Sequence, residues 1–275
     1  DWTGSAFPRM PPSMPTAPDS PDPVRPAKRG GRMADGAAVE EVPVWLEINH
    51  QPAVTWMCTP DQLEELALGW LAGEGYIERV EDVRLRPCAT DLGFWAELDA
   101  ERVAAINASG RQQVLASGCG AVGIWLSDES LNPLPHAARR GEPLPSDAPA
   151  AEALRARFKE LFALGERYRD TGGIHAAALT DGQALLTHAE DIGRHNAVDK
   201  VIGAALLARR PVEGLGLLVT GRISAELAAK SARARLGWVA TPSVPSTLAV
   251  EIARRAGMIL IGRAVSGTPH VHCAE

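Results

Sequence analysis

One cysteine lies in a run of small residues that suits it for chemistry. Cys119 belongs to the segment Ser117-Gly118-Cys119-Gly120, and Gly123 follows shortly after it. Glycines let the backbone bend freely, so the sulfur of such a loop can approach a partner or a ligand closely. Only the thiolate attacks, and a nearby cation or helix N-terminus must favour that form. The segment predicts a nucleophilic Cys119, with a tight turn around a small apolar residue as the alternative interpretation.

The other cysteines, Cys58, Cys88 and Cys273, stand apart from one another. No C-x-x-C pair occurs, which excludes a zinc ribbon and a thioredoxin-like redox motif. We expect these three thiols to be packed or incidentally exposed rather than reactive. Scattered thiols without a secretory signal are typical of a reduced, cytoplasmic protein.

A second group of candidate residues surrounds a predicted helix start at 190–200. Asp191 is expected to cap this helix, and Arg194, His195 and Asn196 fall in its first turn. Free N–H groups together with Arg194 and His195 would bind a phosphate. The carboxylates of Asp191 and Asp199 would instead hold a base or a sugar hydroxyl. A charged helix face with Asp–Arg pairs is the alternative interpretation.

Polar residues also follow or precede predicted strands. Gly221, Arg222 and Ser224 follow a buried strand and open a helix, which is the crevice where open α/β sheets bind ligands. Segment 241–246 repeats this strand–loop–helix layout, so two neighbouring loops predict a nucleotide-sized site. His175 follows a glycine pair at the start of another strand, where it either faces a ligand or is a hydrogen-bonded core histidine.

Several common catalytic motifs are missing from the sequence. Neither a P-loop nor a G-x-S-x-G nucleophile elbow occurs. A zinc deaminase needs H-x-E and P-C-x-x-C, but Ala176 and Ala177 follow His175 and there is no cysteine pair. The sequence therefore does not support a zinc-dependent deaminase.

The predicted strands and helices that must position these residues follow a different pattern in each of the two parts of the chain. The first part alternates short strands with one clear helix: strands over 39–48 and 53–58 around a turn at 49–52, a helix capped by Thr59-Pro60-Asp61, then strands at 82–88, 94–106 and 112–117. The second part alternates strands with longer helices: helices over 151–167, 192–207, 224–236 and 246–256, and strands over 174–179, 183–187, 216–220, 238–241 and 258–262. Asp181-Gly182 is a strong hairpin signal. This alternation predicts a three-layer α/β fold.

Two proline-rich segments divide the chain. Residues 1–38 hold 8 of the 21 prolines and lack apolar periodicity, so we expect a disordered leader, with Met10, Met14 or Met33 as possible start sites. Residues 132–150 hold five more prolines and are expected to be a loop or linker. The predicted domains are therefore 39–131 and 151–275.

Charge separates the two halves of the 275-residue chain. The formal net charge is -6, made of -10 in residues 1–150 and +4 in residues 151–275. This balance argues against a general nucleic-acid binder, although the basic half suits one anionic ligand. No apolar run approaches the ~20 residues of a membrane span.

Taken together, these motifs resemble those of the formate dehydrogenase accessory sulfurtransferase family, often called the FdhD family. The matching segments occur in the family order between residues 39 and 262. They are Glu41-Val42-Pro43-Val44, Leu66-Ala67-Leu68-Gly69-Trp70, Gly73-Glu74-Gly75-Tyr76-Ile77, Ser117-Gly118-Cys119-Gly120, Thr171–Ala178, Glu190–Lys200, Gly221–Ser224 and Pro245-Ser246.

The resemblance implies a fold and a function. The fold would be a three-layer, cytidine-deaminase-like α/β C-terminal domain with a mixed sheet and no zinc, plus a smaller α+β N-terminal domain, in a homodimer. The function would be that of a sulfur carrier. It would take sulfur from a cysteine desulfurase and pass it, through a Cys119 persulfide, to the molybdenum (or tungsten) bis-guanine-dinucleotide cofactor that formate dehydrogenase needs. A guanine nucleotide would mimic that cofactor.

The residues expected to line the cofactor site come from the segments above and from the C-terminal end. They are His175, Asp191, Arg194, His195, Asn196, Asp199, Gly221, Arg222, Ser224, Arg263, Ala264, Val265, Ser266, Gly267 and Thr268.

Two departures from the family pattern bear on this interpretation. The family loop commonly reads C-G-V-C-G, but Val122 stands in place of the second cysteine, so only a one-cysteine relay is available. Arg263 replaces an aromatic residue, and Val271-His272 replaces the V-Y pair. A non-catalytic cofactor chaperone is the first alternative. A nucleotide hydrolase or deaminase-like enzyme is the second, and the missing metal motif counts against it.

Overall fold

The computed structural model describes residues 38–108, 112–115, 122–125 and 148–272. Cys119, Cys273 and most of the two proline-rich segments lie outside these residues. The described chain forms a four-stranded sheet, a six-stranded sheet and a two-stranded sheet of β5 (Gln112–Leu115) and β6 (Val122–Trp125).

The four-stranded sheet has the order β2-β1-β4-β3. It contains β1 (Val42–Ile48), β2 (Gln51–Cys58), β3 (Arg84–Pro87) and β4 (Gly93–Glu97). β1 and β2 are antiparallel, as predicted, and β1 and β4 are parallel, so the sheet is mixed. Asn49 and His50 make a tight two-residue turn between β1 and β2, with φ angles of 47° and 66°.

Helix α1 (Leu63–Gly73) covers this sheet with Leu66, Leu68 and Leu71, all of them buried. The predicted cap at Thr59–Asp61 is wrong, because the helix begins at Leu63 after Gln62. The side chains of Thr59 and Asp61 bind groups from the second half of the chain instead of the first turn of α1.

The predicted strand over 94–106 is correct only at its start. β4 ends at Glu97, and α2 (Ala100–Ala108) follows. The Asp99 carboxylate accepts a hydrogen bond from the backbone N–H of Arg102, which is how a side chain stabilises the first turn of a helix. A single 3₁₀ turn, η1 (Val80–Asp82), precedes β3.

The six-stranded sheet has the order β12-β11-β10-β9-β7-β8. Its strands are β7 (His175–Thr180), β8 (Leu185–Asp191), β9 (Gly216–Val219), β10 (Trp238–Ala240), β11 (Ile259–Gly262) and β12 (His270–His272). β9, β10 and β11 are parallel, whereas β7, β8 and β12 run antiparallel to their neighbours. The predicted hairpin around Asp181-Gly182 joins β7 to β8.

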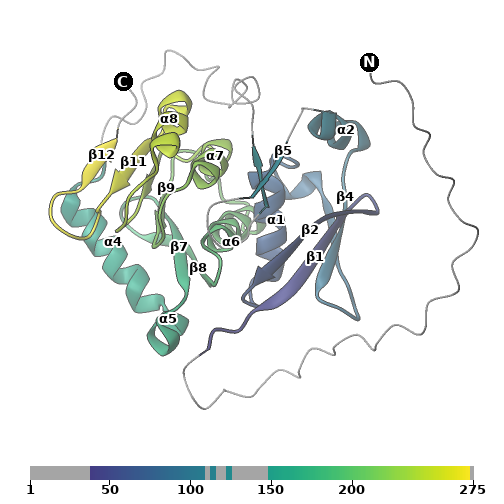
Figure 1. Cartoon of the computed structure of the whole chain (residues 1–275), viewed down its shortest axis with the longest axis horizontal. Helices are drawn as coiled ribbons and strands as arrows, with labels where there is room; N and C mark the ends of the chain where they lie inside the picture. Colours follow the sequence, from purple (N-terminus) through teal and green to yellow (C-terminus); the bar gives the residue numbers. More distant parts are fainter. Residues whose placement is uncertain (1–37, 109–111, 116–121, 126–147, 273–275) are drawn as a thin grey trace, which may run out of the picture. The chain divides into compact units, whose positions relative to one another are not determined.

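Helices cover both faces of this sheet (Figure 1). One buried cluster joins the sheet to α6 (Arg194–Leu207), α7 (Ala225–Arg233) and α8 (Thr247–Ala256). A second cluster joins the opposite face to α4 (Ala151–Leu164). The helix predicted over 151–167 breaks at Gly165, and α5 (Glu166–Thr171) follows. The three layers expected from the alternation of strands and helices are present.

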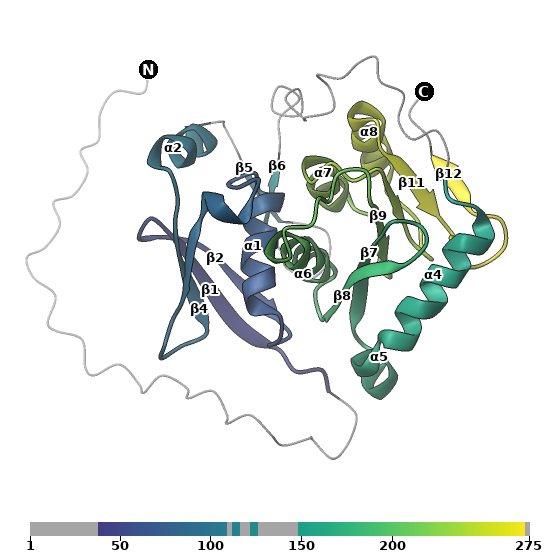
Figure 2. The ribbon, with the colours of Figure 1, turned by 180° about the vertical axis from the view of Figure 1, so that it is seen from behind.

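Helices α1 and α6 lie side by side and link the two sheets (Figures 1 and 2). Their backbones approach closely at two glycines. A Cβ atom at Gly69 would lie 1.7 Å from the carbonyl oxygen of Asp199, and one at Gly203 would lie 1.9 Å from that of Glu65. Only glycine fits at either crossing point, so the match of these two positions fixes how α1 packs on α6.

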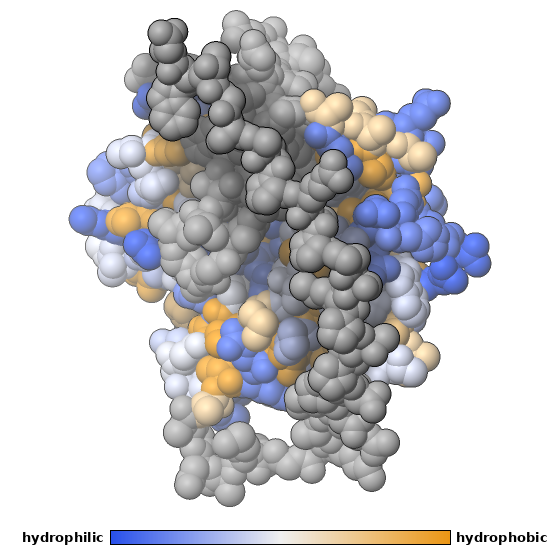
Figure 3. Space-filling view, turned by 45° about the vertical axis from the view of Figure 1, so that its right-hand side comes forward, coloured by the Kyte–Doolittle hydropathy of each residue, from blue (hydrophilic) through white to orange (hydrophobic). Residues whose placement is uncertain are grey.

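The described surface visible in Figure 3 mixes hydrophilic and hydrophobic residues in small groups. Among the helices of the described ranges, none has the combination of length and apolar character that crossing a membrane requires.

Candidate functional site

The predicted polar segments meet at one edge of the six-stranded sheet. Because β9, β10 and β11 are parallel, the loops that follow them leave the sheet at the same edge. β7 is antiparallel to β9, so His175 at the start of β7 lies at this edge too. Its register partner is Asp191 at the end of β8. We call this edge, with loops 220–224, 241–246 and 262–263, the carboxyl edge.

Hydrogen bonds tie the three loops of the carboxyl edge into one surface. The Thr241 hydroxyl donates to the carbonyl of Gly221 at 2.7 Å. The backbone N–H of Ser246 donates to the carbonyl of Ile223 at 2.9 Å, and that of Arg263 donates to the carbonyl of Ser243 at 2.8 Å. The predicted pair of neighbouring loops is therefore present as a single connected unit.

Two helices begin at this edge. Ser224 Oγ accepts a hydrogen bond from the N–H of Leu227 at 3.4 Å, and Ser246 Oγ accepts one from the N–H of Ala249 at 3.1 Å. Both serines are therefore helix N-caps. The partial positive charge of two adjacent helix N-termini favours an anion here.

Exposed arginines add formal charge to the carboxyl edge. Arg222 and Arg263 are both exposed, and each belongs to one of the loops. Arg263 has a φ of 52°, a left-handed conformation that costs free energy for a residue with a side chain. Guanidinium groups beside two helix N-termini can bind the oxygens of a phosphate.

Gly221 lies where Arg194 and His175 approach the loop most closely. A Cβ atom at this position would lie 3.1 Å from Cδ of Arg194 and 3.3 Å from Cε1 of His175. A larger residue at this position would require the Arg194 or His175 side chain to shift by a few tenths of an ångström. The structure thus brings together three residues that the sequence predicted separately.

His195 does not supply the positive charge that its sequence position suggested. It is buried, and burial, together with the charges of Lys230 and Arg194, lowers its pKa to about 3. The imidazole is therefore neutral near pH 7. Its Nε2 atom lies 3.0 Å from Oγ of Ser224, so His195 positions the cap of α7.

Burial and the nearby Arg194 also lower the pKa of His175, which disfavours the charged form of its imidazole. It is partly exposed at the edge, so its ring can contact a ligand as a neutral hydrogen-bonding group. The positive potential of the edge comes from arginines and helix N-termini rather than from imidazolium groups.

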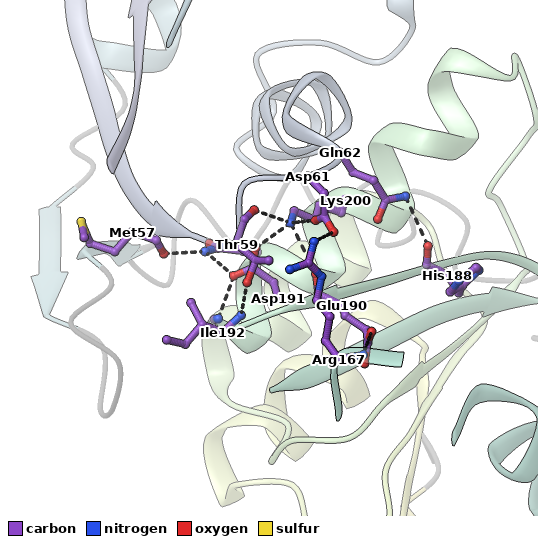
Figure 4. Close-up of polar contacts among 12 residues, drawn as sticks. Met57, Thr59, Asp61, Gln62, Arg167, His188, Glu190, Asp191, Ile192 and Lys200 are labelled. Carbon is purple, nitrogen blue, oxygen red and sulfur yellow. Dashed lines mark hydrogen bonds and ion pairs between the residues drawn. The ribbon is translucent and has the colours of Figure 1, made fainter. Parts of the chain in front are cut away.

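Asp191 is not the helix cap that the sequence suggested, because α6 begins at Arg194 with Gly193 as its N-cap. The buried Asp191 carboxylate lies 2.7 Å from Nζ of Lys200 and accepts from the N–H of Gly193 and from Nδ2 of Asn196, at 2.8 and 3.0 Å (Figure 4). Asp191 therefore holds the turn that leads into α6, and its carboxylate binds groups of the protein itself.

Lys200 is the centre of this buried cluster, which Figure 4 shows. Its Nζ atom donates to the carbonyl of Thr59 at 3.0 Å and to Oδ1 of Asp61 at 2.8 Å. The N–H of Thr59 donates to Asp191 at 3.2 Å. These contacts join the chain after β2 to the start of α6.

Asp199 belongs to a second buried cluster. Its Oδ2 atom lies 2.7 Å from Nζ of Lys230, and both side chains are almost fully buried. Burial raises the pKa of Asp199 to about 7, which the ion pair with Lys230 offsets only in part. Its carboxylate binds a protein group, and a role for it toward a base or sugar stays a prediction.

The segment 263–268 splits into exposed and buried residues. Ser266, Gly267 and Thr268 are exposed together with Arg263, and Val265 is partly buried. Ala264 is fully buried against α4 and the sheet, so its side chain is part of the core. Contacts of this segment with a cofactor stay a prediction.

Of the four cysteines, the structure describes Cys58 and Cys88, which are buried and partly exposed as the sequence suggested, and Cys119 and Cys273 lie outside the described residues. Cys58 is fully buried, and burial raises its pKa to about 12, so its thiol is inert. Cys88 is partly exposed, and a hydrogen bond with Thr90 lowers its pKa. The sequence did not single out Cys88 as the more acidic of the two.

Sequence reasoning also missed the two buried lysines. Lys200 and Lys230 each stand among apolar or small residues of a helix, and this pattern was the available sign of their burial.

Among the residues that the structure describes, no group of three or more His, Cys, Asp or Glu side chains is placed to hold a metal ion. The carboxyl edge is thus equipped to bind an anion through arginines, backbone N–H groups and serine caps.

Comparison with known proteins adds a family relationship. Residues 39–275 match the sequence model of the FdhD/NarQ family. The chain is 38% identical over 256 residues to a protein of Anaeromyxobacter dehalogenans named sulfur carrier protein FdhD, with 86% of this chain and 85% of that protein covered. It is 36% identical over 258 residues to a protein of the same name from Xanthomonas campestris pv. campestris, with 88% and 89% covered.

A solved structure resembles the fold described above. It is a crystal structure from Desulfotalea psychrophila of a protein described as a candidate formate dehydrogenase accessory protein. The TM-score is 0.64 at 24% sequence identity, and 86% of this chain and 87% of that chain are covered. At this identity the likeness supports the mixed α/β fold alone.

Proposed function

Because the chain belongs to the FdhD/NarQ family, we propose that it is a sulfur carrier protein that serves the maturation of a formate dehydrogenase. The observation that carries the proposal is the carboxyl edge, where two capped helix N-termini and two exposed arginines form one surface for an anionic ligand. The ligand we propose is the molybdenum bis-guanine-dinucleotide cofactor, bound as a substrate.

Cys119 is the proposed sulfur-carrying residue. Its thiolate attacks the outer sulfur of a persulfide on a cysteine desulfurase, the donor S–S bond breaks, and the desulfurase cysteine leaves as a thiolate. A new S–S bond on Cys119 then holds the sulfur for transfer to the cofactor. Val122 stands where the family commonly has its second cysteine, so the relay uses a single thiol.

The proposed nucleotide surface uses only groups that reach the carboxyl edge. Arg222 and Arg263 bind phosphate oxygens, and the partly exposed Ser224 lies at the start of α7. Gly221 is buried and leaves room for the side chains of Arg194 and His175. His195 orients Ser224 and carries no charge itself. We leave out Asp191 and Asp199, because both are buried in ion pairs.

The proposed setting is a cytoplasmic homodimer that meets a cysteine desulfurase and a formate dehydrogenase. Scattered thiols and the family relationship support this setting. A cross-linking and sedimentation experiment on the full chain tests the dimer, with a monomer at micromolar concentration as the contrary result.

Mass spectrometry tests the role of Cys119 directly. The full chain is incubated with a cysteine desulfurase and cysteine, and the added sulfur is located by peptide mapping. We expect a persulfide on Cys119 that Cys119→Ala abolishes, while the matched variant Cys88→Ala retains it. Persulfide that forms only on other cysteines would contradict the proposal.

A separate measurement tests the nucleotide surface. We expect GDP to bind the full chain and the variants Arg222→Gln and Arg263→Gln to weaken that binding by about tenfold, since each removes one charge-assisted contact of roughly 1.5 kcal/mol. Lys159→Gln removes an exposed cation of α4 and serves as the control. Equal affinity in all variants would place the ligand elsewhere.

A non-catalytic cofactor chaperone is the second candidate function. The observation that favours it is Val122, because a vicinal cysteine pair is missing. This candidate predicts that cofactor binding and maturation of formate dehydrogenase both survive Cys119→Ala. The sulfur carrier predicts that binding survives and maturation fails.

A nucleotide hydrolase gains no support from the carboxyl edge. Nε2 of His195 faces both Ser224 Oγ, at 3.0 Å, and Glu226 Oε2, at 3.6 Å. In a Ser–His–acid triad the acid binds the other ring nitrogen, where it can orient the base. This arrangement therefore positions Ser224 and does not activate it.

A further inference from the structure

Two histidines lie side by side on the last strand of the large sheet. His270 and His272 are two positions apart on β12, so both side chains leave the strand on the same face. Their rings stack, with centroids 5.0 Å apart and 13° between the ring planes. His270 is exposed and His272 is partly exposed, so solvent reaches the pair.

We propose that His270 and His272 bind a divalent first-row transition metal ion, such as Ni²⁺ or Zn²⁺, at a surface site. Imidazole nitrogen is a preferred ligand of these ions. Two protein ligands leave the other coordination positions to water or to an incoming anion. This site is unrelated to a deaminase zinc, whose motif the sequence lacks, and it is independent of the sulfur-carrier role.

The two rings must move from their observed positions to hold a metal ion. With metal–nitrogen bonds of about 2.0–2.1 Å, two tetrahedral ligand nitrogens lie roughly 3.4 Å apart. The rings, at 5.0 Å between centroids, must therefore tilt toward each other. His270 is exposed, so rotation about its side-chain bonds meets little steric hindrance.

Metal ions bind the neutral imidazole ring and compete with protons for it. The positive charge of Arg254 acts on His272, so it opposes a bound cation and limits the affinity of the site.

The strand register places this pair beside the carboxyl edge. His270 pairs with Gly262, the residue before Arg263, and His272 pairs with Leu260, which lies two residues further from the edge. A bound ion at His270 would thus bring a dication, with open coordination positions, next to one of the loops of the carboxyl edge. An oxyanion such as phosphate is the class of ligand that those positions accept.

Titration calorimetry with Ni²⁺ tests the site. The full chain is used without an affinity tag, and its thiols are blocked with N-ethylmaleimide so that cysteines do not compete for the metal. We expect one Ni²⁺ per chain, and we expect His270→Gln and His272→Gln each to weaken binding by about tenfold or more. The control is His188→Gln, which removes an exposed histidine from β8, the opposite edge strand.

Three results would overturn the proposal: no saturable Ni²⁺ binding, wild-type affinity in both β12 variants, or an equal loss in the His188 control. A second readout needs no substitution. Electron paramagnetic resonance of one equivalent of Cu²⁺ on the thiol-blocked chain should show coupling to two imidazole nitrogens. Coupling to fewer than two would contradict a site made by this histidine pair.

Discussion

Replacement of Lys200 by methionine tests whether the buried cluster in Figure 4 holds the fold around the carboxyl edge. The side chain of Lys200 is fully buried, and its Nζ atom lies within 3.0 Å of Asp61, Asp191 and the carbonyl of Thr59. Methionine has a similar volume, so the variant removes the charge and the donors while leaving little cavity. The Asp191 carboxylate would then be buried without its cation.

The expected loss follows from that uncompensated charge. Breaking a buried ion pair by removing one partner costs about 3–5 kcal/mol. In a domain of this size each kcal/mol lowers the midpoint of thermal unfolding by about 2–4 °C, so we expect a decrease of roughly 6–20 °C. Urea denaturation followed by circular dichroism gives the free energy of unfolding directly.

Two further variants make the test specific. Lys159→Met makes the same substitution at an exposed site on α4 and should change the free energy of unfolding by less than about 0.5 kcal/mol. Adding Asp191→Asn to Lys200→Met removes the uncompensated charge and should restore part of the loss. A loss below about 1 kcal/mol in Lys200→Met, or a double variant whose losses simply add, would refute the reasoning.

Other predictions concern protonation, helix packing and thiol reactivity. Because His195 has a pKa of about 3 when folded and an ordinary value of 6.5, the unfolded chain binds more protons between these values, and stability should fall as the pH is lowered through this window. In urea titrations, His195→Gln should reduce the pH dependence of the free energy of unfolding by up to about 1.4 kcal/mol per pH unit. The control His188→Gln should leave this pH dependence unchanged. Gly203→Ala places a Cβ atom 1.9 Å from a backbone carbonyl of α1 and should lower the free energy of unfolding by about 2 kcal/mol or more; a neutral effect would contradict the close packing of α1 on α6. Iodoacetamide labelling of the native chain should modify Cys88 and spare Cys58, and labelling of Cys58 before unfolding would contradict its burial.

Local patterns predicted most of the elements of the large sheet. The hairpin at Asp181-Gly182 and the alternation of strands with helices both appear as expected. Each of these features depends on residues close together in the chain. Their physical causes, turn conformation and hydrophobic periodicity, are therefore visible in the sequence.

The errors occur where distant residues decide the outcome. The sequence around Thr59 and Asp61 carries a good helix-capping signal, but both side chains bind partners more than a hundred residues away. Asp191 likewise binds Lys200 and Thr59, and Gly193 takes the N-cap position of α6. Helix propensity is a local property, so it cannot predict an ion pair between residues far apart in the chain. For a buried carboxylate, such an ion pair is more stabilising than a helix-capping hydrogen bond.

The chemistry of the carboxyl edge follows from the same long-range burial. Two histidines come close to the edge, but His195 and His175 share their surroundings with Arg194, and His195 with Lys230 as well. A protonated imidazole there would bury a further positive charge beside existing ones, so both rings stay neutral and act as hydrogen-bonding groups. The positive charge that attracts an anion must then come from solvent-exposed groups, namely Arg222 and Arg263, and from the N-termini of α7 and α8. Since an arginine keeps its charge at any physiological pH, a phosphate that binds this edge does so without proton uptake by the protein.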